Sequence, residues 1–150
     1  MSGEAATTSQ TATVSTQSSA AISDVKEVLF RQVHPDLFDG KEPASSAFRP
    51  TPDDEDQLST DRSSMTTSKD AYELYVSNKR KSVATFGVTV GEFGEQRLSC
   101  FPDPVKCTET TKANPAHARV DFSALGTNQQ KKIAKRLKKA AVSRGILYKP

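Results

Sequence analysis

Apolar and polar residues follow one another along this chain in short runs with definite ends, and each run predicts one element. Residues 28–33 (VLFRQV) are apolar and rich in β-forming side chains, which predicts a strand. His34-Pro35 ends it, because proline has no backbone donor. Residues 36–57 carry three prolines, one glycine and a run of carboxylates, which predicts a long irregular loop. Residues 58–62 predict a short second strand.

A helix is predicted after this strand. Thr67 and Asp70 stand ahead of AYELYVSN at the three-residue spacing of a capping box. Apolar and polar positions from Ala71 to Asn78 then recur with the period of a helix. Asn78 and the cations at 79–81 suit a helix C-terminus, where positive charge meets the carbonyl end of the helix dipole.

Residues 82–93 (SVATFGVTVGEF) alternate, which predicts the longest strand. Gly91 and Gly94 then indicate a turn into a strand at 97–101, so that the two strands form an antiparallel hairpin. Pro102 and Pro104 end the second of them. After another loop, residues 118–122 (ARVDF) predict a further strand.

The closing helix is expected at about 128–144. Leu125 offers a staple-like contact, Thr127 and Gln130 have capping-box spacing, and Gly145 provides a stop after Arg144. A narrow apolar stripe follows one side of this helix and predicts close packing against a sheet; its members are Ile133, Ala134, Leu137, Ala140 and Ala141.

The order of these elements predicts an α+β fold, with a mainly antiparallel sheet of about four to six short strands and two helices, one of them the basic C-terminal helix. A chain of 150 residues suits one domain, expected at 25–150. Residues 1–24 are expected to form a disordered tail, because Ser, Thr and Ala bury too little apolar surface to offset the entropy of ordering.

The composition excludes several classes of protein. The tail lacks the basic start and apolar run of a secretory signal, and no run of about 18 apolar residues predicts a membrane span. Two cysteines, Cys100 and Cys107, in a chain without an export signal indicate reduced thiols and a cytoplasmic protein. Together with His34 and His117 they fit no zinc spacing, so no metal is expected.

Charge is distributed unevenly although the net charge is only +3. Acidic residues crowd positions 36–61, whereas the closing helix carries a basic cluster without an acidic residue: Lys131, Lys132, Lys135, Arg136, Lys138 and Lys139. Such a cluster can neutralise several phosphates, so nucleic acid or an acidic protein is the expected partner. The alternatives are a solvated helix face and pairing with the acidic loop.

A second group of cationic residues comes from strand ends and the long loop: Arg31, His34, Arg49 and Arg62. If these positions converge, arginines can hold a phosphate bidentately and His34 can exchange protons near neutral pH. The alternative is that Arg31 and Arg62 pair with nearby acidic residues of the loop or with Asp61.

The order of the pieces between 28 and 95 resembles the ADP-ribosyltransferase superfamily, with Arg31 or His34 on a first strand, Ser59 or Thr60 before a helix, and Glu92 or Glu95 after a later strand. The resemblance implies an NAD-consuming toxin or modifying enzyme, with Arg31, His34, Ser59, Arg62 and Glu92 as its catalytic site and NAD as its cofactor. Without that activity no cofactor is expected.

The sequence therefore supports three hypotheses about function. The first is a small cytoplasmic module that binds a polyanion or an acidic protein through the lysine-rich helix. The second is the NAD-consuming enzyme, and the third is an interaction subunit of a larger assembly, whose tail acts as a tether.

Overall fold

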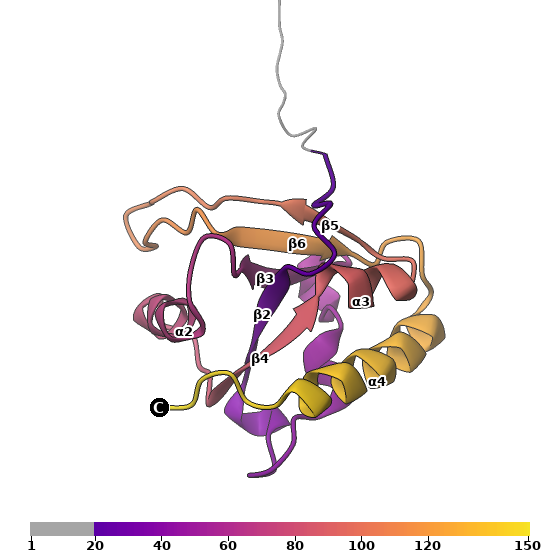
Figure 1. The fold of residues 1–150 in the computed structure, drawn as a ribbon. Coiled ribbons are helices and arrows are strands. Elements are labelled where there is room, and N and C mark those ends of the chain that lie inside the picture. Colours follow the sequence, from indigo (N-terminus) through magenta and orange to yellow (C-terminus); the bar gives the residue numbers. More distant parts are fainter. Residues whose placement is uncertain (1–19) are drawn as a thin grey trace, which may run out of the picture.

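The computed structural model describes residues 20–150, and it is an α+β fold built on one five-stranded antiparallel sheet (Figure 1). Its strands are β2 (Val28–Val33), β3 (Gln57–Arg62), β4 (Ala84–Thr89), β5 (Ser99–Pro102) and β6 (His117–Asp121). They lie in the order β4-β2-β3-β6-β5. The α+β class and the antiparallel sheet predicted from the sequence are confirmed.

The α-helices of the described part are α2 (Ser68–Ser77), α3 (Val90–Glu95) and α4 (Thr127–Arg144). Three short 3₁₀ helices, η1 (Pro35–Leu37), η2 (Ser45–Phe48) and η3 (Pro52–Asp54), interrupt the long loop between β2 and β3. The strand before His34-Pro35 and the closing helix are confirmed, and Gly145 ends α4 with a positive φ of 95°.

The core lies between α4 and one face of the sheet. Cross-strand register puts alternate residues of each strand on this face, where the side chains are fully buried. They include Leu29, Val33, Leu58, Phe86, Val88 and Val120. From α4, Ile133, Ala134, Leu137 and Ala141 close the core, as the stripe predicted, whereas Ala140 is half-buried.

Helix α2 lies on the opposite face of the sheet, over β2 and β4. Thr67 is its N-cap, and the Thr67 hydroxyl accepts the Asp70 backbone N–H (3.1 Å). Ala71 is buried beneath it. The predicted start of this helix is therefore confirmed.

The prediction that residues 82–93 form one strand is wrong. β4 ends at Thr89, because the Thr89 hydroxyl accepts the Glu92 N–H (3.0 Å) and the Glu92 carboxylate accepts the Thr89 N–H (2.8 Å), a capping box that starts α3. Val90 and Phe93, three residues apart, are buried from this helix. Residues 20–150 therefore contain three α-helices, where two were expected.

The predicted hairpin between 82–93 and 97–101 is wrong for the same reason. Helix α3 carries the chain away from β4, and β5 pairs with β6 at the far edge of the sheet. Phe101 and its neighbours do form a strand, but β4 and β5 are the two opposite edges.

The predicted capping box of Thr127 and Gln130 is also wrong. Gly126 is the N-cap of α4, and its N–H donates to the Gln129 side chain (3.3 Å). The Gln130 amide is buried and donates instead to Asp56 Oδ1 (3.0 Å) and to the Leu125 carbonyl (3.1 Å), so it fastens the start of α4 to the end of the long loop.

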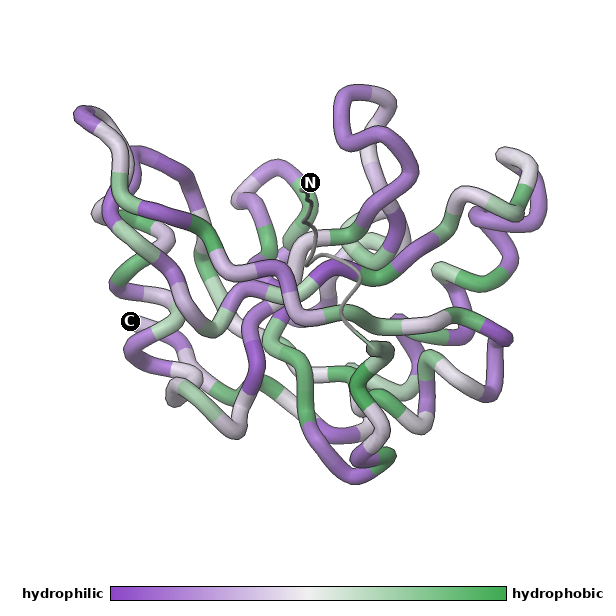
Figure 2. The backbone as a smooth tube through the Cα atoms, turned by 90° about the horizontal axis from the view of Figure 1, so that it is seen from above, coloured by the Kyte–Doolittle hydropathy of each residue, from purple (hydrophilic) through white to green (hydrophobic). Residues whose placement is uncertain are grey.

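Residues 1–19 lie outside the described part, and with them most of the predicted tail. Ile22, which the sequence assigned to the tail, is buried, and its N–H donates to the Cys100 carbonyl (2.7 Å). Hydrophilic residues prevail in the loops that project from the body of the molecule (Figure 2).

Candidate functional site

The basic cluster of α4 faces away from the core. At 3.6 residues per turn, Lys131, Lys135 and Lys139 form one row along the helix, with Lys132 and Arg136 in the row beside it. Both rows lie opposite the buried stripe, and all five side chains are exposed. Neighbours within a row are separated by a rise of about 6 Å. We refer to Lys131, Lys132, Lys135, Arg136, Lys138 and Lys139 together as the basic face.

Little of this charge is neutralised within residues 20–150. Lys138 pairs with Glu42 of the long loop (3.3 Å), and Arg136 donates to the Gln96 side chain (3.1 Å). Among residues 20–150, the other four lysines of the basic face form no ion pair. The expected alternative, pairing of this helix with the acidic loop, is therefore seen for Lys138 and for none of the other lysines of the basic face within residues 20–150.

A groove borders the basic face, between α4 and the loop that carries η2. It encloses about 460 Å³ and is lined by Glu42, Ser45, Lys135, Lys138, Lys139 and Val142. Three lysines against one carboxylate give this groove a positive charge.

A second and smaller cavity lies on the other face of the sheet, where α2 and the 105–114 loop meet β2, β3 and β6. It measures about 110 Å³. Register places Phe30, Asp61 and His117 in one row across the three strands, so the three side chains share this face. Tyr75 and Asn78 line the cavity from α2, and Arg80, Lys112 and Asn114 line it from the adjoining loops.

Arg31 sits where β2 and β3 separate. The two strands pair only at Leu29↔Arg62 and Phe30↔Asp61, whereas β2 and β4 pair over six residues. Arg31 Nη1 donates to the Ser59 carbonyl of β3 (3.0 Å), which links the two strands where their backbones separate. Arg31 Nε donates to the Ala47 carbonyl of η2 (2.7 Å). Burial lowers the pKa of Arg31.

Asp61 is the buried carboxylate of this cavity. Its side chain accepts the Asn114 amide (2.7 Å), and the residue is 8% exposed. Burial raises the pKa of Asp61, and the Asn114 hydrogen bond and the nearby charges of His117 and Arg31 act in the opposite direction. His117 Nδ1 donates to the Asp103 carbonyl (2.8 Å), which fixes the orientation of the ring.

Of the proposed catalytic residues, the structure brings together Arg31 and Ser59, which both line the cavity, along with Thr60. His34 does not line it. Its Nδ1 accepts the Asp36 N–H (3.0 Å) and caps η1 in the long loop. Arg49 follows η2 and is likewise outside the lining.

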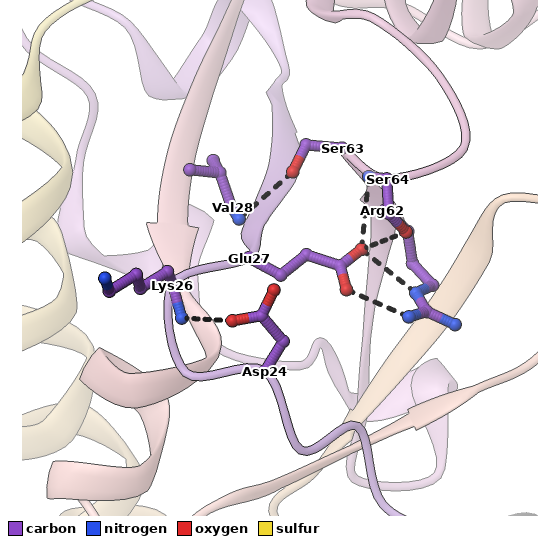
Figure 3. Close-up of polar contacts among 7 residues, drawn as sticks. All are labelled: Asp24, Lys26, Glu27, Val28, Arg62, Ser63 and Ser64. Atoms are coloured by element: carbon purple, nitrogen blue, oxygen red, sulfur yellow. Dashed lines mark hydrogen bonds and ion pairs between the residues drawn. The ribbon is translucent and has the colours of Figure 1, made fainter.

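Arg62 is held in a different cluster (Figure 3). Its Nε and Nη2 donate to the two carboxylate oxygens of Glu27 (3.0 and 2.9 Å), and the same carboxylate accepts the backbone N–H and the hydroxyl of Ser64 (3.2 and 2.6 Å). Glu27 is 6% exposed. The partner of Arg62 is therefore neither the acidic loop nor Asp61.

The Glu92 carboxylate on α3 is already engaged in hydrogen bonds within the fold. One oxygen caps the helix, and both accept from the Arg144 guanidinium (2.9 and 3.0 Å). Burial raises the pKa of Glu92, but the bonds from Arg144 and Thr89 outweigh it and hold that pKa below its ordinary value. Glu95, the other candidate, is exposed at the end of the same helix.

The cysteines fit no nucleophilic site. Cys100 is buried in the core, and burial raises the pKa of its thiol to about 12. Cys107 is exposed, and both thiols are free. Across residues 20–150 no group of three His, Cys, Asp or Glu side chains is placed to hold a metal ion. Nor does any helix in this part combine the length and apolar character needed to cross a membrane.

The sequence did not single out Tyr75, Asn78 or Asn114 as site residues. One signal was present for two members of the cavity: Asp61 and His117 are polar residues that lie near strand ends, next to turns. Only the strand order puts them side by side.

Comparisons with protein-family models, with curated proteins and with solved structures found no significant match to this chain.

Proposed function

We propose that this chain is a cytoplasmic binding module that contacts nucleic acid through the basic face of α4. The observation that carries the proposal is the row Lys131, Lys135 and Lys139 with Lys132 beside it: four exposed lysines, opposite the core, with no carboxylate partner in residues 20–150. Free thiols at Cys100 and Cys107 support the cytoplasmic assignment.

The helix is well suited to present this charge. Its buried stripe packs on the sheet, and Gln130 fixes its first turn to Asp56 of the long loop. Arg144 ties its last turn to Glu92 and to the Gly87 carbonyl (2.9 Å). Lysines on a rigid helix can follow the phosphates of a duplex without base contacts, so we expect binding that depends weakly on sequence.

The NAD-consuming alternative has less support. Arg31 and Ser59 meet at the cavity, but Glu92 is engaged by Arg144 and does not line it. The cavity of about 110 Å³ is also smaller than the roughly 300–1,000 Å³ usual for larger ligands. An acidic protein, or a subunit of a larger assembly, competes for the basic face on the same charge argument.

The test is fluorescence anisotropy with a labelled mixed-sequence duplex at increasing KCl. Neutralisation of four phosphates predicts a slope of log affinity against log salt near −3.6, from about −0.9 per phosphate. We expect Lys132→Glu with Lys135→Glu to abolish binding. A double variant with the same change in charge, Lys26→Glu with Lys69→Glu, alters exposed lysines outside α4 and is expected to bind nearly as the wild type.

Two results would overturn the proposal: absence of binding at low salt, or equal loss in both double variants, which would mean that net charge alone is at work. Binding of an acidic peptide but not of the duplex, with the same dependence on Lys132 and Lys135, would favour the protein partner. Release of nicotinamide from NAD, lost in Arg31→Ala, would favour the enzyme.

A further inference from the structure

The cavity between α2 and the sheet is lined by several hydrogen-bond donors that have no partner in the described part of the chain. Beyond the bonds to Ala47 and Ser59, the Arg31 guanidinium has three N–H groups without a partner within residues 20–150. The hydroxyls of Tyr75 and Ser59 and the Asn78 amide nitrogen also make no hydrogen bond to the described part of the chain. A ligand that fits this lining must accept several hydrogen bonds at once.

A further donor lies in the cavity wall. Gln32 is 6% exposed, and its side-chain oxygen accepts the hydroxyls of Ser82 (2.8 Å) and Thr85 (2.9 Å). Its Nε2 is the buried side-chain polar atom that has no partner in residues 20–150. A buried donor without an acceptor is costly and favours negative charge nearby, so an anion in the adjoining cavity would stabilise this position.

The charge of the cavity lining also favours a ligand that accepts several hydrogen bonds. The lining contains three cations, Arg31, Arg80 and Lys112, and one carboxylate, Asp61, which leaves a net charge of +2 when His117 is neutral. A phosphate monoester carries about −1.5 to −2 near neutral pH and has three acceptor oxygens. A carboxylate carries half that charge and fewer acceptor sites, so it matches the lining less well.

We propose that this cavity binds a small phosphorylated compound, whose phosphate is held by Arg31, Tyr75 and Lys112. Its size of about 110 Å³ suits a compound of a few carbon atoms rather than a nucleotide or a dinucleotide. One oxygen of Asp61 accepts from Asn114, and the other has no partner in residues 20–150. That oxygen is the acceptor for a hydroxyl or amino group next to the phosphate.

The site is separate from the basic face. The cavity lies on the α2 face of the sheet, and α4 covers the other face. Variants of one surface therefore leave the other intact, and the proposal stands or falls independently of nucleic-acid binding.

The experiment is a titration of ¹⁵N-labelled protein with inorganic phosphate and with glycerol 3-phosphate, at constant ionic strength, followed by NMR. We expect saturable shifts at residues of the cavity, including the Gln32 side-chain amide. Tyr75→Phe and Lys112→Ala are each expected to weaken phosphate affinity about tenfold, as for a hydrogen bond to a charged group.

Two controls match these variants. Tyr72→Phe makes the same change on the same helix, at a ring that contacts Tyr148 and does not line the cavity. Lys106→Ala makes the same change in the same loop, also outside the lining. Both are expected to bind phosphate as the wild type does, and so is the Lys132→Glu, Lys135→Glu variant of the basic face.

Asp61→Asn separates the two parts of the proposal. Removal of the negative charge should tighten binding of inorganic phosphate, whereas glycerol 3-phosphate should gain less, because the amide is a poorer acceptor for its hydroxyl. The proposal is overturned if no saturable shift occurs up to about 50 mM phosphate, where a millimolar site would be filled. Equal weakening by Tyr72→Phe and Tyr75→Phe, or equal shifts with chloride, would also overturn it.

Discussion

Glu27 is a charged residue at a buried position, and four donors make this possible. Arg62 supplies two N–H groups, and Ser64 supplies its backbone N–H and its hydroxyl (Figure 3). These bonds, the Arg62 pair foremost, hold the pKa of Glu27 below its ordinary value although burial acts to raise it. The cluster joins the chain just before β2 to the turn after β3.

We expect Glu27→Gln to lower the free energy of unfolding by about 2 kcal/mol at neutral pH, because the variant weakens charge-assisted bonds and leaves the half-buried Arg62 without its counter-ion. The effect should depend on pH. Since folding lowers the pKa of Glu27, its contribution is complete above the unfolded value of about 4.3 and is lost as the pH falls through the folded value. Urea denaturation at pH 7 and at about pH 3 measures both quantities.

Glu73→Gln is the matched control, because Glu73 is exposed on α2 and its side chain makes no hydrogen bond or ion pair within residues 20–150. It is expected to change stability by less than about 0.5 kcal/mol. If Glu27→Gln is equally mild at pH 7, or if the difference between Glu27→Gln and the wild type stays the same at low pH, the cluster does not stabilise the fold as described.

The ion pair between Arg62 and Glu27 could not be predicted from the sequence. The sequence places Arg62 at a strand end and acidic residues close to it, which led to the expectation of pairing with the loop or Asp61. Glu27 lies close to Arg62 only through the register Leu29↔Arg62, which brings the residues flanking two strands together. Side-chain pairs across a sheet depend on the strand register, and a single sequence specifies that register only weakly.

At the scale of elements, the boundary between β4 and α3 is indicated by a helix cap and not by the alternation of apolar residues. Alternation continues from Ala84 through Val90, so periodicity alone extends the strand too far. Thr89 and Glu92 nevertheless stand at capping-box spacing, the same signal that located the start of α2 at Thr67. The capping-box spacing therefore predicts the start of α3, whereas the alternation alone extends the strand beyond its true end at Thr89.

The glycine at the centre of β4 provides a test at this scale. A Cβ on Gly87 would lie 2.6 Å from Val28 Cγ1 and 2.6 Å from Leu147 Cδ1. Val28 is a stiff β-branched residue on the neighbouring strand, so the clash requires movement of the strand or of the C-terminal segment. We expect Gly87→Ala to destabilise the fold by about 1–3 kcal/mol, measured by urea denaturation.

Gly94→Ala is the control within the same stretch of chain. Gly94 belongs to α3, and a Cβ there meets no atom within 4 Å. Alanine in a helix is favoured over glycine, so this variant should be neutral or more stable by up to about 1 kcal/mol. A Gly87→Ala variant as stable as Gly94→Ala would contradict the close packing of β4 against β2 and the C-terminal segment.

At the scale of the whole molecule, the sequence predicted the fold class but not the arrangement that creates the candidate sites. Most strands and both longer helices have local signals, and their order is enough to indicate an α+β fold. The cavity, by contrast, depends on β3 lying between β2 and β6 and on the early separation of β2 from β3. The basic face could be predicted from the sequence because it depends only on the period of one helix.

The C-terminal segment joins the parts of the molecule across the edge of the sheet. After α4, the Leu147 N–H donates to the Thr85 carbonyl (2.9 Å) and the Tyr148 carbonyl accepts the Thr85 N–H (2.8 Å), so the segment pairs with β4. The Tyr148 ring lies 5.2 Å from that of Tyr72 on α2, and the Ser68 hydroxyl donates to the Leu147 carbonyl (3.2 Å). The segment thus links α4, β4 and α2.

Deletion of residues 146–150 is therefore expected to lower the free energy of unfolding by about 3 kcal/mol, from two edge hydrogen bonds, one aromatic pair and the apolar burial of Leu147. Hydrogen exchange should become faster at the Thr85 amide, which loses its acceptor, and throughout α2, which loses its contact with Tyr148. Removal of the exposed Pro150 alone should leave both measurements unchanged. If exchange in α2 is the same with and without residues 146–150, then α2 is held by the sheet alone, and the wall of the cavity that it forms does not depend on the C-terminal segment.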